Sequence, residues 1–73
     1  MQANQIIADF RVKCRTEMYE KLDAAVAEAY FEAVGNGTRG VLVTRHDFDW
    51  FSVALSHDVP FGLTRERDHA RRN

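Results

Sequence analysis

The residues best suited to chemistry in this 73-residue chain are imidazoles and carboxylates that surround a stretch rich in β-branched and aromatic residues. His46, Asp47 and Asp49 fall within four residues, and His57 and Asp58 follow later in the chain. Such groups together bind divalent metals or transfer protons. Their spacing matches no established ligand pattern, and aspartate is common at turns because its carboxylate accepts local backbone N–H groups. We therefore predict a structural turn with no metal, no cofactor and no catalytic residue.

Cys14 is the single cysteine, so the chain forms neither an intramolecular disulfide nor a zinc framework of cysteine pairs. A reactive thiolate needs a nearby base or a helix N-terminus. We place Cys14 on the apolar ridge of a helix, which predicts a buried packing role. Gly35, Gly37 and Gly40 match the spacing of a dinucleotide fingerprint, but they follow a predicted helix and precede a predicted strand, the reverse of the required order. We reject that fingerprint.

Cationic side chains near the C-terminal end of the chain indicate a second kind of site, one that binds phosphate groups. Arg45 and Trp50, on a predicted hairpin, could add a stacking platform for a single strand of nucleic acid. The formal net charge of −1 excludes attraction of the whole chain to nucleic acid, so any contact must be local. The alternative is that the tail only aids solubility and that Trp50 belongs to the core or to an interface. The predicted phosphate contacts are Arg65, Arg67, Arg71 and Arg72.

The length and composition indicate one small folded domain. At 8.4 kDa the chain has room for a single hydrophobic core, and 45% apolar with 29% charged residues is typical of globular proteins rather than disordered ones. The segment from Met1 to Asn4 lacks a basic stretch followed by an apolar one, as a secretory signal would require. No apolar run approaches the roughly 18 residues of a membrane span. We predict a cytoplasmic chain without membrane contact.

The first half of the chain has the pattern of a helix. Residues 4–34 contain no proline or glycine and are rich in strong helix formers. Every fourth residue from Ile6 to Val34 is apolar, which favours a helix over a strand. Asn4 can cap its N-terminus and Gly35 can end it in the left-handed conformation. We predict one helix over residues 4–34, followed by a Gly-rich linker over 35–40.

The second half has the pattern of a β-hairpin over residues 41–56. Alternation in its second strand directs Phe51, Val53 and Leu55 toward the core, opposite Val41 and Val43. The remainder is predicted as an extended segment over 57–63 and a charged, partly flexible tail over 64–73. The predicted fold class is therefore α+β, in the order helix, strand, strand, with the long helix packed on a two-stranded antiparallel hairpin.

Two arguments predict that the fold is completed by homodimerisation. A helix of about 30 residues spans about 45 Å, whereas a compact chain of this length is about 30 Å across, so the helix breaks near Thr16 or a second subunit covers it. A lone hairpin is also marginal in water and gains from pairing with another edge. The alternative is that the alanine-rich helix surface packs on the chain's own hairpin. The predicted dimer interface is Leu22, Ala25, Val26, Ala29 and Ala33.

From these patterns we predict a non-enzymatic protein-interaction or regulatory module that acts as a homodimer, a role that suits inhibitors carried by phages or mobile elements. It would present an acidic helix face and a hairpin face to a protein partner. The alternative is a small nucleic-acid-binding dimer that uses the Arg-rich tail and the exposed hairpin face. A third hypothesis is a metal-dependent or acid–base enzyme at the imidazoles and carboxylates described above. The predicted partner-binding residues are Arg45, His46, Trp50, Glu28 and Glu32.

Overall fold

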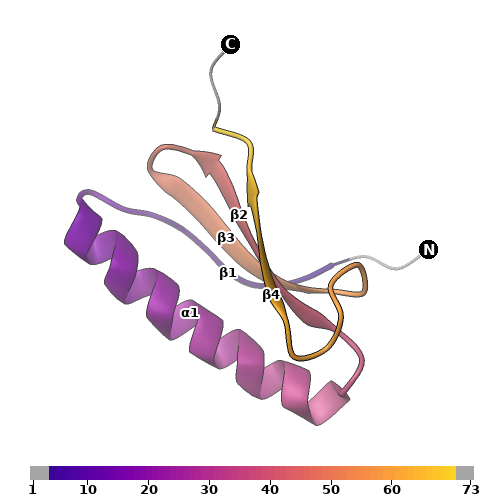
Figure 1. The fold of residues 1–73 in the computed structure, drawn as a ribbon. Coiled ribbons are helices and arrows are strands. Elements are labelled where there is room, and N and C mark those ends of the chain that lie inside the picture. The colour runs from indigo at the N-terminus through magenta and orange to yellow at the C-terminus, as the bar shows by residue number, and fades with distance from the viewer. Residues whose placement is uncertain (1–3, 71–73) are drawn as a thin grey trace.

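Four strands form one sheet, and a helix lies across one face of it in the computed structural model (Figure 1), which describes residues 4–70. The α+β class is confirmed, but the predicted order of helix, strand, strand is wrong, because the chain runs β-α-β-β-β. The elements are β1 (Gln5–Arg11), α1 (Arg15–Asn36), β2 (Gly40–Asp47), β3 (Trp50–Ser56) and β4 (Thr64–Asp68).

The strands lie in the order β1-β3-β2-β4. Both β1 and β2 run antiparallel to β3, so they are parallel to each other, and α1 connects them as the crossover of a βαβ unit that is split by β3. The predicted hairpin is present as β2 and β3, with Val43 opposite Val53. Strand β4 adds in parallel to the other side of β2. The hairpin therefore lies in the middle of the sheet, and β1 and β4 form its two edges.

The segment predicted as the first turns of a long helix is instead the edge strand β1. Apolar residues recur every fourth position in this segment, but its residues also alternate between the two faces of a strand. Ala8 and Phe10 pair with core residues of β3, while Asp9 and Arg11 face the other side. The register shifts between Ile6 and Ala8. Pairing satisfies the backbone N–H and C=O groups along β3, which a helix would have left exposed. Tertiary pairing thus overrides the local helix propensity.

Helix α1 begins after Cys14, which is extended and serves as its N-cap residue. The Cys14 carbonyl accepts the Met18 N–H at 3.0 Å, and the Glu17 carboxylate accepts the Lys13 N–H at 2.6 Å. This carboxylate contact resembles half of a capping box. Because Cys14 precedes the helix at the surface, it is exposed, and the prediction of a buried cysteine is wrong.

The helix ends two residues later than predicted, and Gly35 lies within it. Gly37 adopts the left-handed conformation, with φ of 75°, and donates its N–H to the Ala33 carbonyl at 2.7 Å. A helix of 22 residues is about 33 Å long, which equals the 33 Å longest dimension of the molecule. Since neither an overhanging helix nor a lone hairpin exists, the two arguments for homodimerisation lose their basis.

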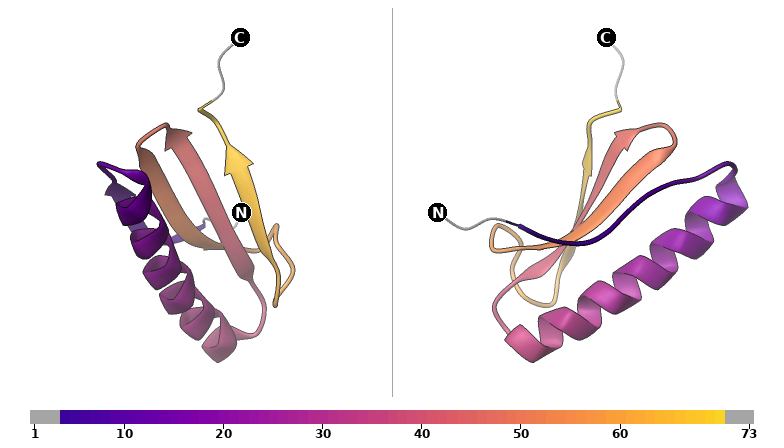
Figure 2. Two further views of the ribbon diagram at one scale, coloured as in Figure 1. Left: turned by 60° about the vertical axis from the view of Figure 1, so that its left-hand side comes forward. Right: turned by 180° about the vertical axis from the view of Figure 1, so that it is seen from behind.

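The core lies between α1 and the sheet (Figure 2). Ala25, Ala29 and Ala33 are 5%, 0% and 1% exposed and pack on β2 and β3. Their small side chains let the helix approach the sheet closely. The alanines predicted as a dimer interface therefore pack on the chain's own sheet, which was the alternative, and Leu22 and Val26 lie partly buried beside them. The sheet residues of the core are Val41, Val43, Val53 and Leu55.

The predicted charged tail contributes a strand. Residues 64–68, which we predicted as the start of this tail and not as a strand, form β4. Every residue of β4 is exposed, and the parallel pairing with β2 supplies its order. Arg71 and Arg72, two of the predicted phosphate contacts, lie outside the described residues, as do residues 1–3. Over residues 4–70, no helix is long and apolar enough to cross a membrane.

Candidate binding groove

The structure separates the five predicted partner-binding residues onto different surfaces. Arg45 faces the helix side of the sheet, in a cavity beside α1. His46 and Trp50 contact each other, with ring centroids 4.5 Å apart, on the opposite side. Glu28 and Glu32 are exposed on α1, and Glu28 borders Ala8 and Phe10 of β1 rather than the hairpin. These residues therefore form no single site.

Trp50 is part of a ridge of side chains across the open face of the sheet. Its indole N–H donates to an Asp9 carboxylate oxygen at 2.7 Å. The Arg11 guanidinium lies 4.9 Å from the indole centroid and also pairs with Asp49 at 3.0 Å. With His46 packed against it as well, the indole is engaged by its own chain. It does not offer the free aromatic surface that the nucleic-acid alternative needs.

The imidazoles and carboxylates of the hairpin turn likewise have structural contacts. His46 Nε2 lies 2.8 Å from the hydroxyl oxygen of Ser52, a residue only 4% exposed, so this Ser–His pair is closed to a substrate. Asp47 accepts the N–H of Phe48, and Asp49 pairs with Arg11. Within residues 4–70, no group of three or more histidine, cysteine or acidic side chains is placed to hold a metal ion.

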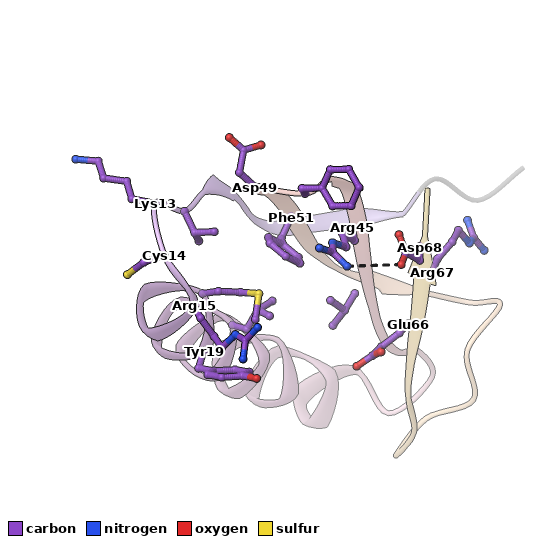
Figure 3. Close-up of a pocket in the computed structure, with 15 residues that line it drawn as sticks. Lys13, Cys14, Arg15, Tyr19, Arg45, Asp49, Phe51, Glu66, Arg67 and Asp68 are labelled. Carbon is purple, nitrogen blue, oxygen red and sulfur yellow. Dashed lines mark ion pairs between the residues drawn. The ribbon is translucent and has the colours of Figure 1, made fainter. Parts of the chain in front are cut away.

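A cavity of about 680 Å³ opens between the start of α1 and the ends of β2 and β4 (Figure 3). Leu22, Val43 and Phe51 contribute apolar surface to it. In the close-up, Glu66 extends from β4 toward α1, while Lys13 and Cys14 point away from the cavity. A volume of this size falls in the range of about 300–1,000 Å³ that is typical of ligand sites. We refer to this space, bounded by α1, β2 and β4, as the α1/β4 groove.

Arg45 occupies an unusual position in the α1/β4 groove. Its guanidinium carbon lies 5.2 Å from the Phe48 ring centroid and 5.8 Å from that of Phe51. The nearest carboxylate oxygen of Asp68 is 3.8 Å from Arg45 Nη1, beyond hydrogen-bond distance. The Nε atom is buried and has no hydrogen-bond partner among residues 4–70. Two aromatic rings therefore flank the guanidinium, and its buried Nε–H has no acceptor among these residues.

Charged residues of both signs border the groove, but their side chains do not all face it. Lys13 points away from the cavity, and Arg67, which pairs with Thr44, extends to the other face of β4 (Figure 3). Asp49 is paired with Arg11, which lies outside the groove. The charged side chains that remain at the groove are Arg15, Arg45, Glu66 and Asp68, so it carries no excess of positive charge.

One flank of α1 leaves large apolar side chains uncovered on the same side. At 100° per residue, Tyr19, Val26, Tyr30 and Val34 share a flank of the helix, next to the face that holds the core alanines, and the exposed Asp23 lies among them. Tyr19 lines the α1/β4 groove, so this flank faces β4 rather than β1. Tyr19, Tyr30 and Val34 are each more than half exposed. Apolar surface is thus available beside the free edge of the sheet.

Strand β4 presents unpaired backbone groups at that edge. The Val41 N–H donates to the Leu63 carbonyl at 3.0 Å, and the His69 N–H donates to the Arg45 carbonyl at 2.8 Å. In a parallel ladder, alternate residues direct both backbone groups to the same neighbour, so odd-numbered residues from 63 to 69 face β2. The residues whose N–H and C=O groups point away from β2 are Thr64, Glu66 and Asp68.

No protein-family model matches this chain, and comparisons with curated proteins and with solved structures found no significant similarity. Function is therefore argued from the site. Sequence reasoning identified Arg45 but missed its groove, because the walls come from α1 and from the unforeseen β4. One signal was available, since Thr64-Arg65-Glu66-Arg67-Asp68 alternates between basic and non-basic residues with the period of a strand.

Proposed function

We propose that this chain is a non-enzymatic protein-interaction module that adds an extended segment of a partner protein to the free edge of β4. The observation that supports this proposal best is the row of outward N–H and C=O groups on Thr64, Glu66 and Asp68, beside the apolar flank of α1. An added strand would satisfy these backbone groups and place alternate side chains against that flank. Binding in this way would occupy the partner segment, which is how a small inhibitor or regulatory chain acts without catalysis.

The charges on β4 favour a strand over a helix as the occupant. Glu66 and Asp68 are exposed on the helix side of β4. A helix laid across them would bury both carboxylates beneath its apolar face, and an unpaired buried charge costs several kcal/mol. A strand that pairs with the edge leaves these carboxylates at the surface. The backbone geometry and the electrostatics therefore support the same occupant.

The same charges argue that the occupant is a different protein rather than a second copy. Two β4 strands could pair with both helices on the same side of the sheet. Residues directly opposite each other then point to the same face, so the arginines meet arginines, and Glu66 and Asp68 meet acidic residues or Thr64. Like charges directly opposite each other destabilise a strand pair, and natural edge strands use them to prevent self-association. A partner with acidic residues opposite Arg65 and Arg67 would be attracted instead.

The nucleic-acid alternative has weaker support. Trp50 is engaged by Asp9, Arg11 and His46, and the hydroxyl-bearing residues Thr44 and Ser52 of the open face are less than 9% exposed. Arg65 and Arg67 remain as exposed cations. Phosphate contact through them would be strongly salt-dependent, whereas strand addition depends mainly on hydrogen bonds and apolar contacts. This difference allows one experiment to separate the two functions.

The test is a titration with a capped peptide of alternating valine and glutamate, followed by calorimetry, with a valine–lysine peptide of the same length as its control. Glutamates placed opposite Arg65 and Arg67 should make the first peptide bind more tightly. The Arg65→Glu, Arg67→Glu double variant should bind it about tenfold more weakly, because each cross-strand charge pair contributes about 0.2–1 kcal/mol, and should now prefer the lysine peptide.

The matched control for this charge reversal is the Lys21→Glu, Arg39→Glu double variant, which makes the same change in net charge away from β4. It should keep the preference of the natural chain. Equal binding of both peptides by every variant would contradict strand addition on β4. Binding of an oligothymidylate instead, falling steeply with salt, would establish the nucleic-acid alternative. Light scattering of the chain without peptide tests whether a second copy occupies the edge. A dimer that persists in the Arg65→Glu, Arg67→Glu variant and that prevents peptide binding would show that it does.

A further inference from the structure

We infer that the side of α1 that faces away from the sheet is a second interaction surface, and that it binds a basic amphipathic helix of a partner protein. Helix α1 contacts β1, β2 and β3 with one side, and among residues 4–70 no other element lies against its opposite side (Figure 1, Figure 2). This outer face of α1 is separate from the flank beside β4, so the inference goes beyond strand addition. Spacing, exposure and charge each support it.

An exposed apolar seam runs along the outer face. Ala24, Ala27 and Phe31 are separated by three and then four residues, so at 100° per residue they lie together on the side of α1 opposite the buried Ala29. All three are exposed, and Phe31, at 81%, is the most exposed large apolar side chain of residues 4–70. Separations of three and four residues are those of the positions that pack together in a pair of helices.

The geometry of the seam favours a helix as its occupant. Backbone N–H and C=O groups in the middle of α1 bond within the helix, so a strand would find no free groups there to pair with. The small side chains of Ala24 and Ala27 allow the axis of a second helix to approach closely. Large apolar side chains of that helix would then cover the Phe31 ring and remove it from water.

The charges beside the seam select a basic partner. Glu20, Glu28 and Glu32 are exposed, and none of them has an ion pair within residues 4–70. Glu28 and Glu32 are one helical turn apart, where like charges destabilise a helix. Lys21 pairs instead with Glu17 at 3.5 Å, and the last turn of α1 carries no basic residue to offset the helix dipole. Cations from a partner would therefore be attracted to this face.

The same charges argue against a second copy as the occupant. Residues 22–36 contain three acidic and no basic residues, so two outer faces placed together would bring carboxylates beside carboxylates in either orientation. Like charges beside the seam of a helix pair oppose pairing, and opposite charges favour it. A partner helix with lysine or arginine beside its apolar residues gains attraction where a second copy meets repulsion.

The experiment is a calorimetric titration with a capped peptide of about three heptads, with leucine at positions a and d and lysine at e and g. One comparison peptide carries glutamate in place of lysine, and another has its leucines and lysines scrambled. The natural chain should bind the first peptide at least about tenfold more tightly than either comparison. Phe31→Ala should weaken binding about tenfold, because it removes the largest apolar side chain of the seam. The Glu28→Gln, Glu32→Gln double variant should weaken it about fivefold, as expected for two surface ion pairs.

The controls make the same changes outside the outer face. Phe61→Ala removes another exposed phenylalanine, and the Asp47→Asn, Asp58→Asn double variant changes the net charge as much as the double glutamine variant. Asparagine at position 47 keeps a side-chain oxygen for the Phe48 N–H. Both controls should bind the leucine–lysine peptide as tightly as the natural chain does.

Three results would overturn the inference. The first is no binding of the leucine–lysine peptide, or binding that Phe31→Ala leaves unchanged. The second is equal binding of the scrambled peptide, which would reduce the effect to attraction between charges. The third is a dimer of the chain alone, seen by light scattering, that Phe31→Ala dissociates, because a second copy would then occupy the face. Phe31→Ala should leave binding of the valine–glutamate peptide unchanged, so this inference and strand addition on β4 can fail separately.

Discussion

The indole N–H of Trp50 donates to the Asp9 carboxylate at 2.7 Å, and this bond joins β3 to β1 across 41 residues of sequence. Asp9 pairs with Ser52 in the register of the two strands, and Arg11 pairs with Trp50 two positions further along. The contact therefore runs diagonally over the open face of the sheet. It connects the edge strand to the hairpin at the end of the sheet opposite Gly40, the first residue of β2. This end is close to the point where the chain leaves β1 for α1.

Replacing Asp9 by alanine should loosen this attachment. Removal of the acceptor leaves the indole N–H to water, and a hydrogen bond of this kind contributes about 0.5–1.5 kcal/mol to stability. Trp50 is the only tryptophan, so its fluorescence reports the change directly. We expect Asp9→Ala to lower the midpoint of urea unfolding and to shift the emission maximum. Asp23→Ala, which removes an exposed carboxylate from α1, should do neither. Identical behaviour of the two variants would contradict a structural role for the bond.

The first half of the chain shows why local pattern predicted only part of the fold. The helix period holds from Met18 to Val34 because these residues are in α1, and the core-facing residues of the hairpin were predicted correctly because alternation there has one interpretation. Residues 5–11 fit both a helix and a strand in their apolar positions. The choice between them depends on the edge of β3, which is distant in sequence. Only pairing across the sheet resolves this ambiguity.

The candidate site was less predictable for a related reason. Arg45 was predicted as a partner-binding residue on a hairpin face shared with Trp50, but Arg45 pairs with the core residue Phe51 and shares the face of Val41 and Val43, so strand alternation places Arg45 and Trp50 on opposite sides of the sheet. The groove also needs β4, whose charged sequence has no apolar face of its own. Its order comes from the ladder with β2, a long-range contact that the composition of the segment does not indicate.

Glu17 should make the stability of the chain dependent on pH. The hydrogen bond from the Lys13 N–H, assisted by the nearby charge of Lys21, lowers the pKa of the Glu17 carboxyl below its usual value. Because the folded-state pKa is the lower one, this stabilisation is complete above the unfolded-state pKa and is lost as the pH falls through the folded-state value. Glu17→Gln should therefore melt at a lower temperature than the natural chain near neutral pH.

The difference between Glu17→Gln and the natural chain should disappear in acid, below the folded-state pKa of Glu17. Melting temperatures measured across a pH series by circular dichroism test this behaviour. Glu20→Gln removes a carboxylate from the same helix and serves as the control for net charge. A gap between Glu17→Gln and the natural chain that stays constant from neutral to acid pH would show that the ionised form has no special role at the N-terminus of α1.

Ala29 should tolerate no enlargement, because it is 0% exposed beneath the sheet. Ala29→Leu forces three extra carbon atoms into the contact between α1 and the strands, and overpacking of this kind costs about 1–3 kcal/mol. Ala27→Leu, on the exposed side of the same helix, should be nearly neutral. Urea unfolding at two protein concentrations also tests the alanine face. A loss of stability that is independent of concentration supports packing within one chain, whereas dependence on concentration would indicate an interface between copies.

Gly40 and Gly35 should respond in opposite ways to the same substitution. A Cβ atom at Gly40 would meet the carbonyl oxygen of Pro60, and it would lie 2.5 Å from the Val59 side chain and 2.8 Å from the Val59 carbonyl oxygen. Gly40→Ala must therefore push the connection between β3 and β4 away from the end of β2. The Gly40 N–H also donates to the Val59 carbonyl at 2.7 Å, so the displacement would weaken a bond that holds this connection.

Gly35→Ala is the matched control, because Gly35 lies in α1 and a Cβ atom there meets nothing within 4 Å. It should stabilise the chain by about 0.5–1 kcal/mol, since alanine loses less backbone entropy than glycine in a helix. Gly40→Ala should destabilise it by about 1–3 kcal/mol. Because β4 follows the displaced connection, Gly40→Ala should also weaken binding of the valine–glutamate peptide, while Gly35→Ala leaves it unchanged. Equal stability of the two variants would mean that the connection can move freely and that the position of β4 does not depend on Gly40.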